Sequence, residues 1–269
     1  VKNPVGHQYD SMAQALALER RWMTGSLRRL FEEARRMQRF VPRGGDRVAD
    51  VLSEVYLSLS DLASNEPVKA RQRVRGAEET LDEGFFTPLH YLTLRAMVWC
   101  DLYDGEHSAA YWRLEGAWPQ LRGSGLMAYR PWQTEIQLTR GLLMLSAARA
   151  GTASPRRAHA YAEKALAILG EDPTPLGRGA QRVLQRALAD RGVMTPDNVQ
   201  EDCGESGAEI FSAGGLWFRA IGQRWSEAGR EEAGEAKARR SVVEVLEREG
   251  VSRPEVFLRI VNIYDATSR

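Results

Sequence analysis

Apolar side chains recur along much of the chain at the spacing of an α-helix. Between residues 46 and 62 they stand at i, i+3, i+4 and i+7, at Val48, Val51, Leu52, Val55, Leu59 and Leu62. This spacing places them on one stripe of an amphipathic helix. A second helix is expected over residues 88–103, because Pro88 favours a first helical turn and Thr87 is a suitable N-cap.

Turn-forming residues divide the rest of the chain into segments of roughly 12–20 residues, too long for typical strands. The interruptions fall at residues 42–45, 65–67, 82–84, 104–105, 123–125, 151–155, 170–175, 195–196 and 250–254. No segment alternates cleanly between apolar and polar residues, as a half-buried strand would. The chain is therefore predicted to be all-α.

Small residues recur at fixed distances after three of these turns. Counting from Asn65, Gly105 and Ala153, an alanine follows after five residues and another seven residues later, giving the pairs Ala70 and Ala77, Ala110 and Ala117, and Ala158 and Ala165. Two alanines on one helix face let a neighbouring helix approach closely, as the second helix of a tetratricopeptide (TPR) hairpin requires. We predict a TPR-like α-α superhelix of stacked antiparallel hairpins; a multi-helix domain without repeats is the alternative.

The predicted hairpins suggest three regions along the chain. Residues 1–45 are interpreted as N-terminal helices that continue from an upstream domain outside this sequence. Residues 46–169 hold the core hairpins. Residues 170–269 are interpreted as further helical hairpins, more degenerate because proline and glycine interrupt them.

Composition and charge narrow the classes of function. The chain of 269 residues is 43% hydrophobic with a formal net charge of +1, which suits a folded core and disfavours nucleic acid as a partner. No run of eighteen apolar residues is present, so no membrane segment is expected. Cys100 and Cys203 form neither a metal-binding spacing nor a disulfide framework. These features favour a reducing cytoplasm.

Motifs of catalysis are weak or absent. Residues 123–128 match a loose dinucleotide-binding pattern and residues 204–208 approach a nucleophile elbow, but both motifs need a preceding strand. No lysine follows a phosphate-binding loop. No histidine has a second metal ligand at i+3 or i+4; the four are His7, His90, His107 and His159. We therefore expect no catalytic residue, cofactor or metal in this chain.

Aromatic residues concentrate between residues 91 and 132, where core packing between long helices is the favoured interpretation. In a TPR array, however, the first helix of each pair lines a concave groove. Counting back from the repeated alanines places Arg95, Trp99 and Arg140 on that face. Arginine and tryptophan dominate binding hot spots, so these three residues are the predicted contacts for a protein or peptide partner.

Several stretches together resemble a known family. They are residues 84–91 (GFFTPLHY), 101–105 (DLYDG), 118–124 (WPQLRGS) and 250–255 (GVSRPE). In this order they are similar to the helical-repeat region C-terminal to the kinase domain of many bacterial eukaryote-like serine/threonine protein kinases. The resemblance spans roughly residues 26–262. It implies a cytoplasmic regulatory or scaffold region, whose kinase activity resides in a part of the protein upstream of this sequence.

Three functions remain open from the sequence. The favoured one is a non-catalytic protein-interaction region of such a kinase. The second is the sensor repeat region of a large ATPase-type transcriptional regulator, which a Walker loop upstream would reveal. The third is an all-α enzyme with a site assembled from scattered residues, which a strongly perturbed acidic or histidine side chain in a pocket would favour.

Overall fold

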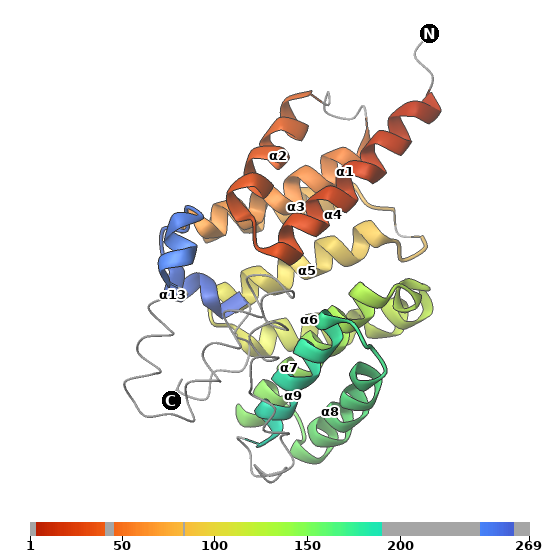
Figure 1. Ribbon diagram of the computed structural model, residues 1–269, viewed down its shortest axis with the longest axis vertical. Helices are drawn as coiled ribbons and strands as arrows, with labels where there is room; N and C mark the ends of the chain where they lie inside the picture. Colours follow the sequence, from red (N-terminus) through yellow and green to blue (C-terminus); the bar gives the residue numbers. More distant parts are fainter. Residues whose placement is uncertain (1–3, 41–45, 83, 190–242, 261–269) are drawn as a thin grey trace.

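The computed structural model describes residues 4–40, 46–82, 84–189 and 243–260, and their regular elements are all helical (Figure 1). The all-α prediction is therefore confirmed for these residues. The α-helices are α1 (Pro4–Thr24), α2 (Leu27–Phe40), α3 (Arg47–Ala63), α4 (Pro67–Glu79), α5 (Pro88–Tyr103), α6 (His107–Gly123), α7 (Arg130–Arg149), α8 (Pro155–Gly170), α9 (Pro175–Ala189) and α13 (Pro254–Phe257). The 3-10 helices are η1 (Leu126–Ala128) and η3 (Leu258–Ile260). Residues 204–208 and Cys203 lie outside the described ranges.

Consecutive helices pack as hairpins, and each hairpin packs on the next. The pairs are α1 with α2, α3 with α4, α5 with α6 and α7 with α8. In addition, α3 contacts both α1 and α5, while α7 contacts α9. The second helix of each pair also touches the first helix of the following pair. Figure 1 shows the resulting stack, from α1 and α2 at one end to α8 and α9 at the other.

After the first helix of each hairpin, one residue adopts the left-handed backbone conformation and turns the chain toward the second helix. Gly25, Asn65, Gly105 and Gly151 have φ values of 72°, 61°, 81° and 74°. The next amide N–H donates to a carbonyl five residues back, as from Glu66 to Asp61 O and from Glu106 to Asp101 O, both at 2.8 Å. This arrangement satisfies carbonyl groups that the helix end leaves free.

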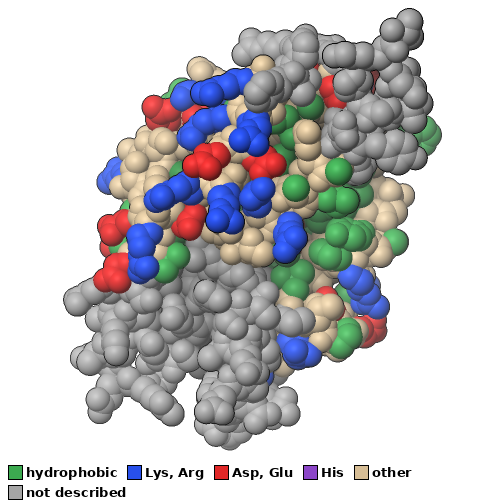
Figure 2. Space-filling view, turned by 45° about the horizontal axis from the view of Figure 1, so that its top comes forward, with side chains coloured by type: hydrophobic (Ala, Val, Ile, Leu, Met, Phe, Trp, Pro, Cys, Tyr) green, Lys and Arg blue, Asp and Glu red, His purple; other side chains and the backbone are tan. Residues whose placement is uncertain are grey.

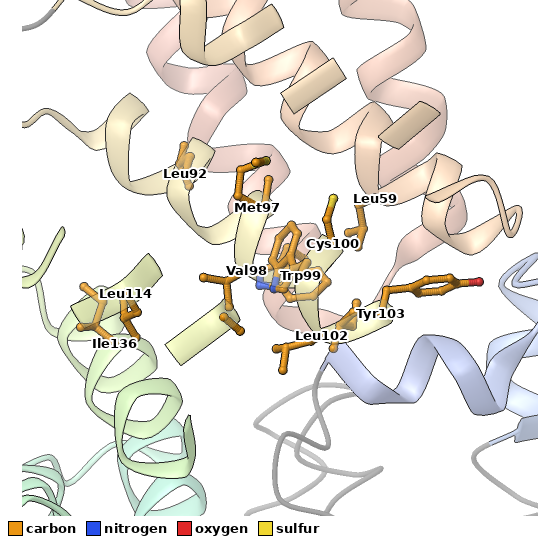
Figure 3. Close-up of a cluster of buried hydrophobic side chains, with 14 of the residues drawn as sticks. Leu59, Leu92, Met97, Val98, Trp99, Cys100, Leu102, Tyr103, Leu114 and Ile136 are labelled. Carbon is orange, nitrogen blue, oxygen red and sulfur yellow. The ribbon is translucent and has the colours of Figure 1, made fainter. Parts of the chain in front are cut away.

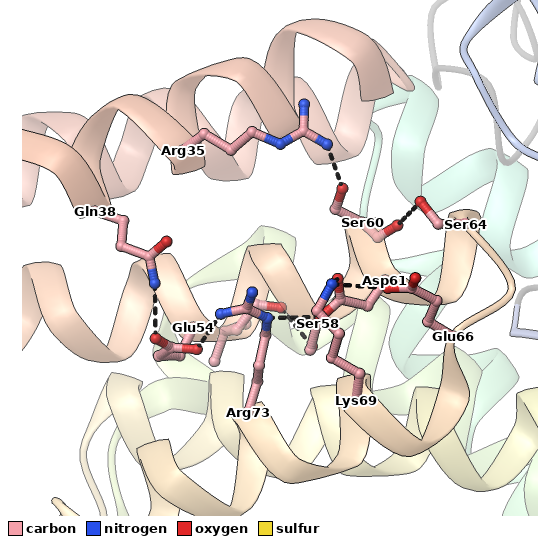
Figure 4. Close-up of polar contacts among 11 residues, drawn as sticks. Arg35, Gln38, Glu54, Ser58, Ser60, Asp61, Ser64, Glu66, Lys69 and Arg73 are labelled. Carbon is pink, nitrogen blue, oxygen red and sulfur yellow. Dashed lines mark hydrogen bonds and ion pairs between the residues drawn. The ribbon is translucent and has the colours of Figure 1, made fainter.

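The hairpins α3–α4 and α5–α6 repeat one another at a distance of forty residues. Equivalent places are held by Asp61 and Asp101, Asn65 and Gly105, Ala70 and Ala110, and Arg73 and Arg113. In each hairpin the arginine is paired with the aspartate. Arg73 Nε lies 2.6 Å from Asp61, and Arg113 Nε lies 2.7 Å from Asp101. Figure 4 shows the first of these pairs within the polar contacts that join α3 to α4.

The third turn differs from the sequence alignment. The left-handed residue there is Gly151, not Ala153, so two additional residues precede α8. Ala158 and Ala165 are nevertheless fully buried, as are Ala70 and Ala110. Ala77 is also buried, whereas Ala117 is only partly buried and lines a cavity, so the predicted burial holds for five of the six alanines.

Helix α5 lies at the centre of the core. Twelve of its sixteen residues are buried, so it is covered on nearly every side. Figure 3 shows Trp99 and Leu102 of α5 within a cluster that also includes Leu59 of α3 and Ile136 of α7. Elsewhere the surface is mixed: basic side chains lie beside acidic ones on the face shown in Figure 2.

The C-terminal segment returns to the first half of the chain. Residues 243–248 are helical, and α13 with η3 follows after a turn at Gly250. Ser252 N–H donates to Ala63 O at 2.7 Å, at the end of α3, and Arg259 donates to Tyr103 O at 3.2 Å, at the end of α5. Phe257 of this segment is fully buried. Two helix ends of the stack are therefore covered by residues far away in sequence (Figure 1).

Two glycines predict opposite effects of one substitution. A Cβ at Gly116 in α6 would meet nothing within 4 Å, whereas one at Gly177 in α9 would lie 2.4 Å from Asp172 Cβ and 2.6 Å from its carbonyl oxygen. We expect Gly116→Ala to raise the free energy of unfolding by about 0.5–1 kcal/mol, because alanine favours the helix. Gly177→Ala is expected to lower it by about 1–3 kcal/mol. Urea unfolding of both variants measures the two free energies. Equal changes in Gly116→Ala and Gly177→Ala would contradict the close contact of Gly177 with Asp172.

Candidate functional site

The guanidinium group of Arg95 joins four helices inside the protein. Its Nη2 lies 2.6 Å from Glu19 Oε1 on α1, and its Nη1 lies 3.1 Å from Glu135 Oε2 on α7. Nη2 also donates to the Tyr56 hydroxyl of α3 at 3.2 Å. Only 5% of the Arg95 side chain is exposed. An arginine can serve this many partners because its five N–H groups form a fixed planar fork.

Aromatic rings surround the same cation. The Arg95 carbon Cζ lies 4.7 Å from the ring centre of Trp99, 5.7 Å from Trp22 and 5.8 Å from Tyr91. Trp22 and Trp99 also contact each other, with ring centres 4.4 Å apart. The rings shield the ion pairs from water and attract the cation through their electron-rich faces.

Charge is unbalanced in this cluster, because one cation faces two carboxylates. Burial raises the pKa of Glu135 above its ordinary value, and nearby Glu19 raises it further, against the opposing effect of Arg95. Burial also raises the pKa of Tyr91 and of Tyr56, so both phenols remain protonated. Tyr91 donates to Glu135 at 3.0 Å and Tyr56 donates to Glu19.

Arg140 forms a second and separate cluster of the same kind. It pairs with Glu115 of α6. Its Cζ lies 3.6 Å from the ring centre of Trp118 and 4.1 Å from that of Tyr161 of α8. With 7% of its side chain exposed, this cation joins α6, α7 and α8.

The predicted contact residues are therefore internal in this conformation. Arg95 and Trp99 lie together, Arg140 lies elsewhere, and all three are buried and engaged by groups of the protein. The carboxylate partners of Arg95 and Arg140 are remote in sequence, so local spacing does not indicate this burial. No observation tests whether a partner reaches these residues, so that role stays a prediction.

A small cavity lies beside Arg95 and Trp99 in the described part of the chain. It measures about 30 Å³ and lies between α5 and α7, and Ile260 of the C-terminal segment forms part of its wall. This space suffices for a water molecule and is too small for a peptide side chain. In this conformation side chains of the protein fill most of the space between α5 and α7.

A larger cavity opens on another side of α5. It measures about 530 Å³ and lies between the end of α4, the loop that follows it, and the facing sides of α5 and α6. We call it the α4–α6 cleft. Its lining residues are Glu78, Glu79, Leu81, Asp82, Gly84, Phe86, His90, Thr93, Leu94, Met97, Arg113, Ala117 and Gln120. The volume falls in the range of natural ligand pockets.

The sequence carries a signal for this cleft on one side of α5. His90, Thr93, Leu94 and Met97 follow helical spacing and share one side of α5, and Phe86 precedes them in the loop. A threonine within an otherwise apolar helical stripe indicates a polar requirement at that place. Arg95 and Trp99 lie on the other side of the same helix.

His90 holds the loop that borders the cleft. Its Nδ1 accepts a hydrogen bond from the Thr87 N–H at 3.1 Å, so the ring proton belongs on Nε2, which lies 2.9 Å from Asp82 O. Both nitrogens are therefore engaged by the chain. His90 serves as the reciprocal half of a capping box at the start of α5, and it fixes one wall of the cleft.

Other chemistry is sparse within the described ranges. No three His, Cys, Asp or Glu side chains come together as metal ligands there. Burial raises the pKa of the Cys100 thiol to about 12, so this thiol stays protonated. Of the helices that the structure describes, none combines the length and hydropathy needed to cross a bilayer.

Comparison with known proteins gives no match. No family model, curated protein or solved structure is detectably similar to this chain. The resemblance to the kinase C-terminal region therefore stays a prediction.

The raised pKa of Glu135 predicts a pH dependence. Between its ordinary pKa and the raised value, the folded protein binds a proton that the unfolded chain has released, so the free energy of unfolding falls as pH rises. Glu135→Gln removes this contribution. We expect the stability of the variant relative to the parent to increase with pH through this window and then level off. Urea unfolding from pH 4 to 8 measures the difference, and a difference that does not change with pH would contradict it.

Proposed function

We propose that this chain is a non-catalytic, TPR-like helical-repeat region that binds a protein partner. The observation that carries the proposal is the forty-residue equivalence of α3–α4 with α5–α6, which includes the turn, the buried alanines and the Asp–Arg pair. Stacked units with nearest-neighbour packing are the architecture of repeat proteins, which present extended surfaces to partners. The α4–α6 cleft, formed by two successive hairpins, is one such surface.

We further propose that the chain is the C-terminal regulatory region of a bacterial serine/threonine protein kinase that acts in the cytoplasm. The support is the order of the sequence stretches at residues 84–91, 101–105 and 118–124. These residues form the loop before α5, the α5–α6 turn and the end of α6. They therefore all belong to one hairpin and the segments that flank it, which is consistent with a single structural unit.

The coding region upstream of Val1 decides between the kinase and the alternative. We expect it to encode a glycine-rich loop, a strand lysine, His-Arg-Asp and Asp-Phe-Gly in that order. A Walker loop in their place would favour the sensor region of an ATPase-type transcriptional regulator. A start codon at Val1 would remove the kinase association and leave a free-standing repeat protein.

Binding without catalysis predicts a selective effect in the parent kinase. Deleting this whole chain should leave phosphorylation of a short generic peptide unchanged, because the catalytic groups lie elsewhere. Phosphorylation of a protein substrate recruited by the repeats should fall on the order of 10–100-fold, since the local concentration of substrate is lost. Initial rates on both substrates test this. If recruitment and phosphorylation of the protein substrate are unchanged, the proposal fails.

A further inference from the structure

We propose that the α4–α6 cleft is the docking site of a partner's peptide segment that carries lysine or arginine beside apolar residues. This inference rests on the proposed binding function and names the chemistry of the partner. Two independent features of the cleft carry it: the charge on its rim and an unsatisfied hydroxyl in its wall.

The rim of the cleft is acidic. Glu78 and Glu79, at the end of α4, are exposed, and neither forms an ion pair with any residue in the described part of the chain. Asp82 adds a third carboxylate, whose Oδ2 lies 2.5 Å from Arg47 Nη1. The one arginine in the wall, Arg113, is bound to Asp101 at 2.7 Å. A cation from a partner would therefore meet two carboxylates without competition from the protein's own arginine.

Apolar side chains line part of the wall below the rim. Leu94 and Met97 of α5, Leu81 and Phe86 of the loop, and Ala117 of α6 line it. Burying a partner's Leu or Met side chain against such a surface is favourable by roughly 1.5–3 kcal/mol. A lysine or arginine stem can follow the same surface while its charged end stays at the rim.

Thr93 makes the cleft more than an apolar hollow. Its side chain is 2% exposed and lines the cavity, yet its hydroxyl oxygen has no hydrogen-bond partner in the described chain. A buried hydroxyl without a partner costs about 1–3 kcal/mol. Threonine in a helix can turn its hydroxyl toward the carbonyl four residues earlier, and no such bond forms here. A ligand group that hydrogen-bonds this hydroxyl would recover the lost free energy.

The geometry thus orders three contacts from the inside outward. A hydrogen-bonding group of the peptide meets Thr93 in the wall, an apolar side chain packs on Leu94 and Met97, and a cation lies near Glu78 and Glu79. An acidic peptide would meet like charge at the rim and is rejected by the same arrangement.

The test uses two fluorescein-labelled 12-residue peptides, one composed of leucine and lysine and one of leucine and glutamate. Fluorescence anisotropy against the full chain should show saturable binding of the lysine peptide only, weakening as salt is raised. The double variant Glu78→Lys with Glu79→Lys should weaken binding at least about tenfold. Its matched control reverses two exposed carboxylates of α8 and its C-cap, Glu163→Lys with Glu171→Lys, with the same change in net charge. The control should bind nearly as the parent does.

Two variants that leave the charge unchanged distinguish binding in the cleft from nonspecific electrostatic attraction. Thr93→Val keeps the shape of the side chain and removes the hydroxyl, so it should weaken peptide binding about 3–10-fold while leaving thermal stability equal or higher. Ala117→Phe should fill the cleft and abolish saturable binding at constant charge. Circular dichroism confirms that each variant is folded before its affinity is interpreted.

Three results would overturn the cleft as the docking site: equal weakening by the two charge-reversed pairs, equal binding of the acidic peptide, or unchanged affinity in both Thr93→Val and Ala117→Phe. None of these results would by itself defeat the proposed function. If substrate recruitment in the parent kinase still requires the chain but ignores the cleft variants, a partner binds at another surface. If recruitment does not require the chain, the proposed function fails with it.

Discussion

The buried guanidinium of Arg95 sets the spacing of four helices in this protein. Two carboxylates, a phenol and three aromatic rings converge on it from α1, α3, α5 and α7. Removing the cation alone would leave two largely covered acids without their counter-charge, which should lower the free energy of unfolding. Apolar side chains of similar volume can give the protein the same free energy of unfolding. Their contacts are not directional, however, so they allow the helices to pack at many different spacings. The ionic cluster allows few helix spacings, because its hydrogen bonds are short and directional.

The Asp–Arg pair of the hairpin α5–α6 is also tied to the preceding hairpin. Asp101 of α5 binds Arg113 of its own hairpin and Arg71 of the preceding hairpin, both at 2.7 Å. One buried carboxylate thus couples α4, α5 and α6. The same contacts hold together the helices that form the walls of the α4–α6 cleft, and the loop after α4 completes the lining.

The sequence predicted local features well and long-range partners poorly. Helical periodicity, glycine at positive φ and paired alanines act within one or two turns, so the all-α class and the turns at Asn65 and Gly105 could be derived directly. Arg95 differs, because its partners Glu19 and Glu135 lie 76 and 40 residues away. Nothing local distinguishes an arginine that meets buried acids from one that meets a partner. The α4–α6 cleft was missed for a related reason: it forms only where two helix faces and a loop come together.

The closure of the C-terminal segment over α3 and α5 has a consequence for synthesis of the protein. A simple repeat array can fold from its first unit onward while translation continues, since each unit needs only its neighbours. Here the ends of α3 and α5 receive their covering residues, Phe257 and Ile260, from a segment that leaves the ribosome much later. The nascent chain therefore carries exposed apolar helix ends until that segment arrives. A chain interrupted before it would present the same apolar surface to chaperones and proteases.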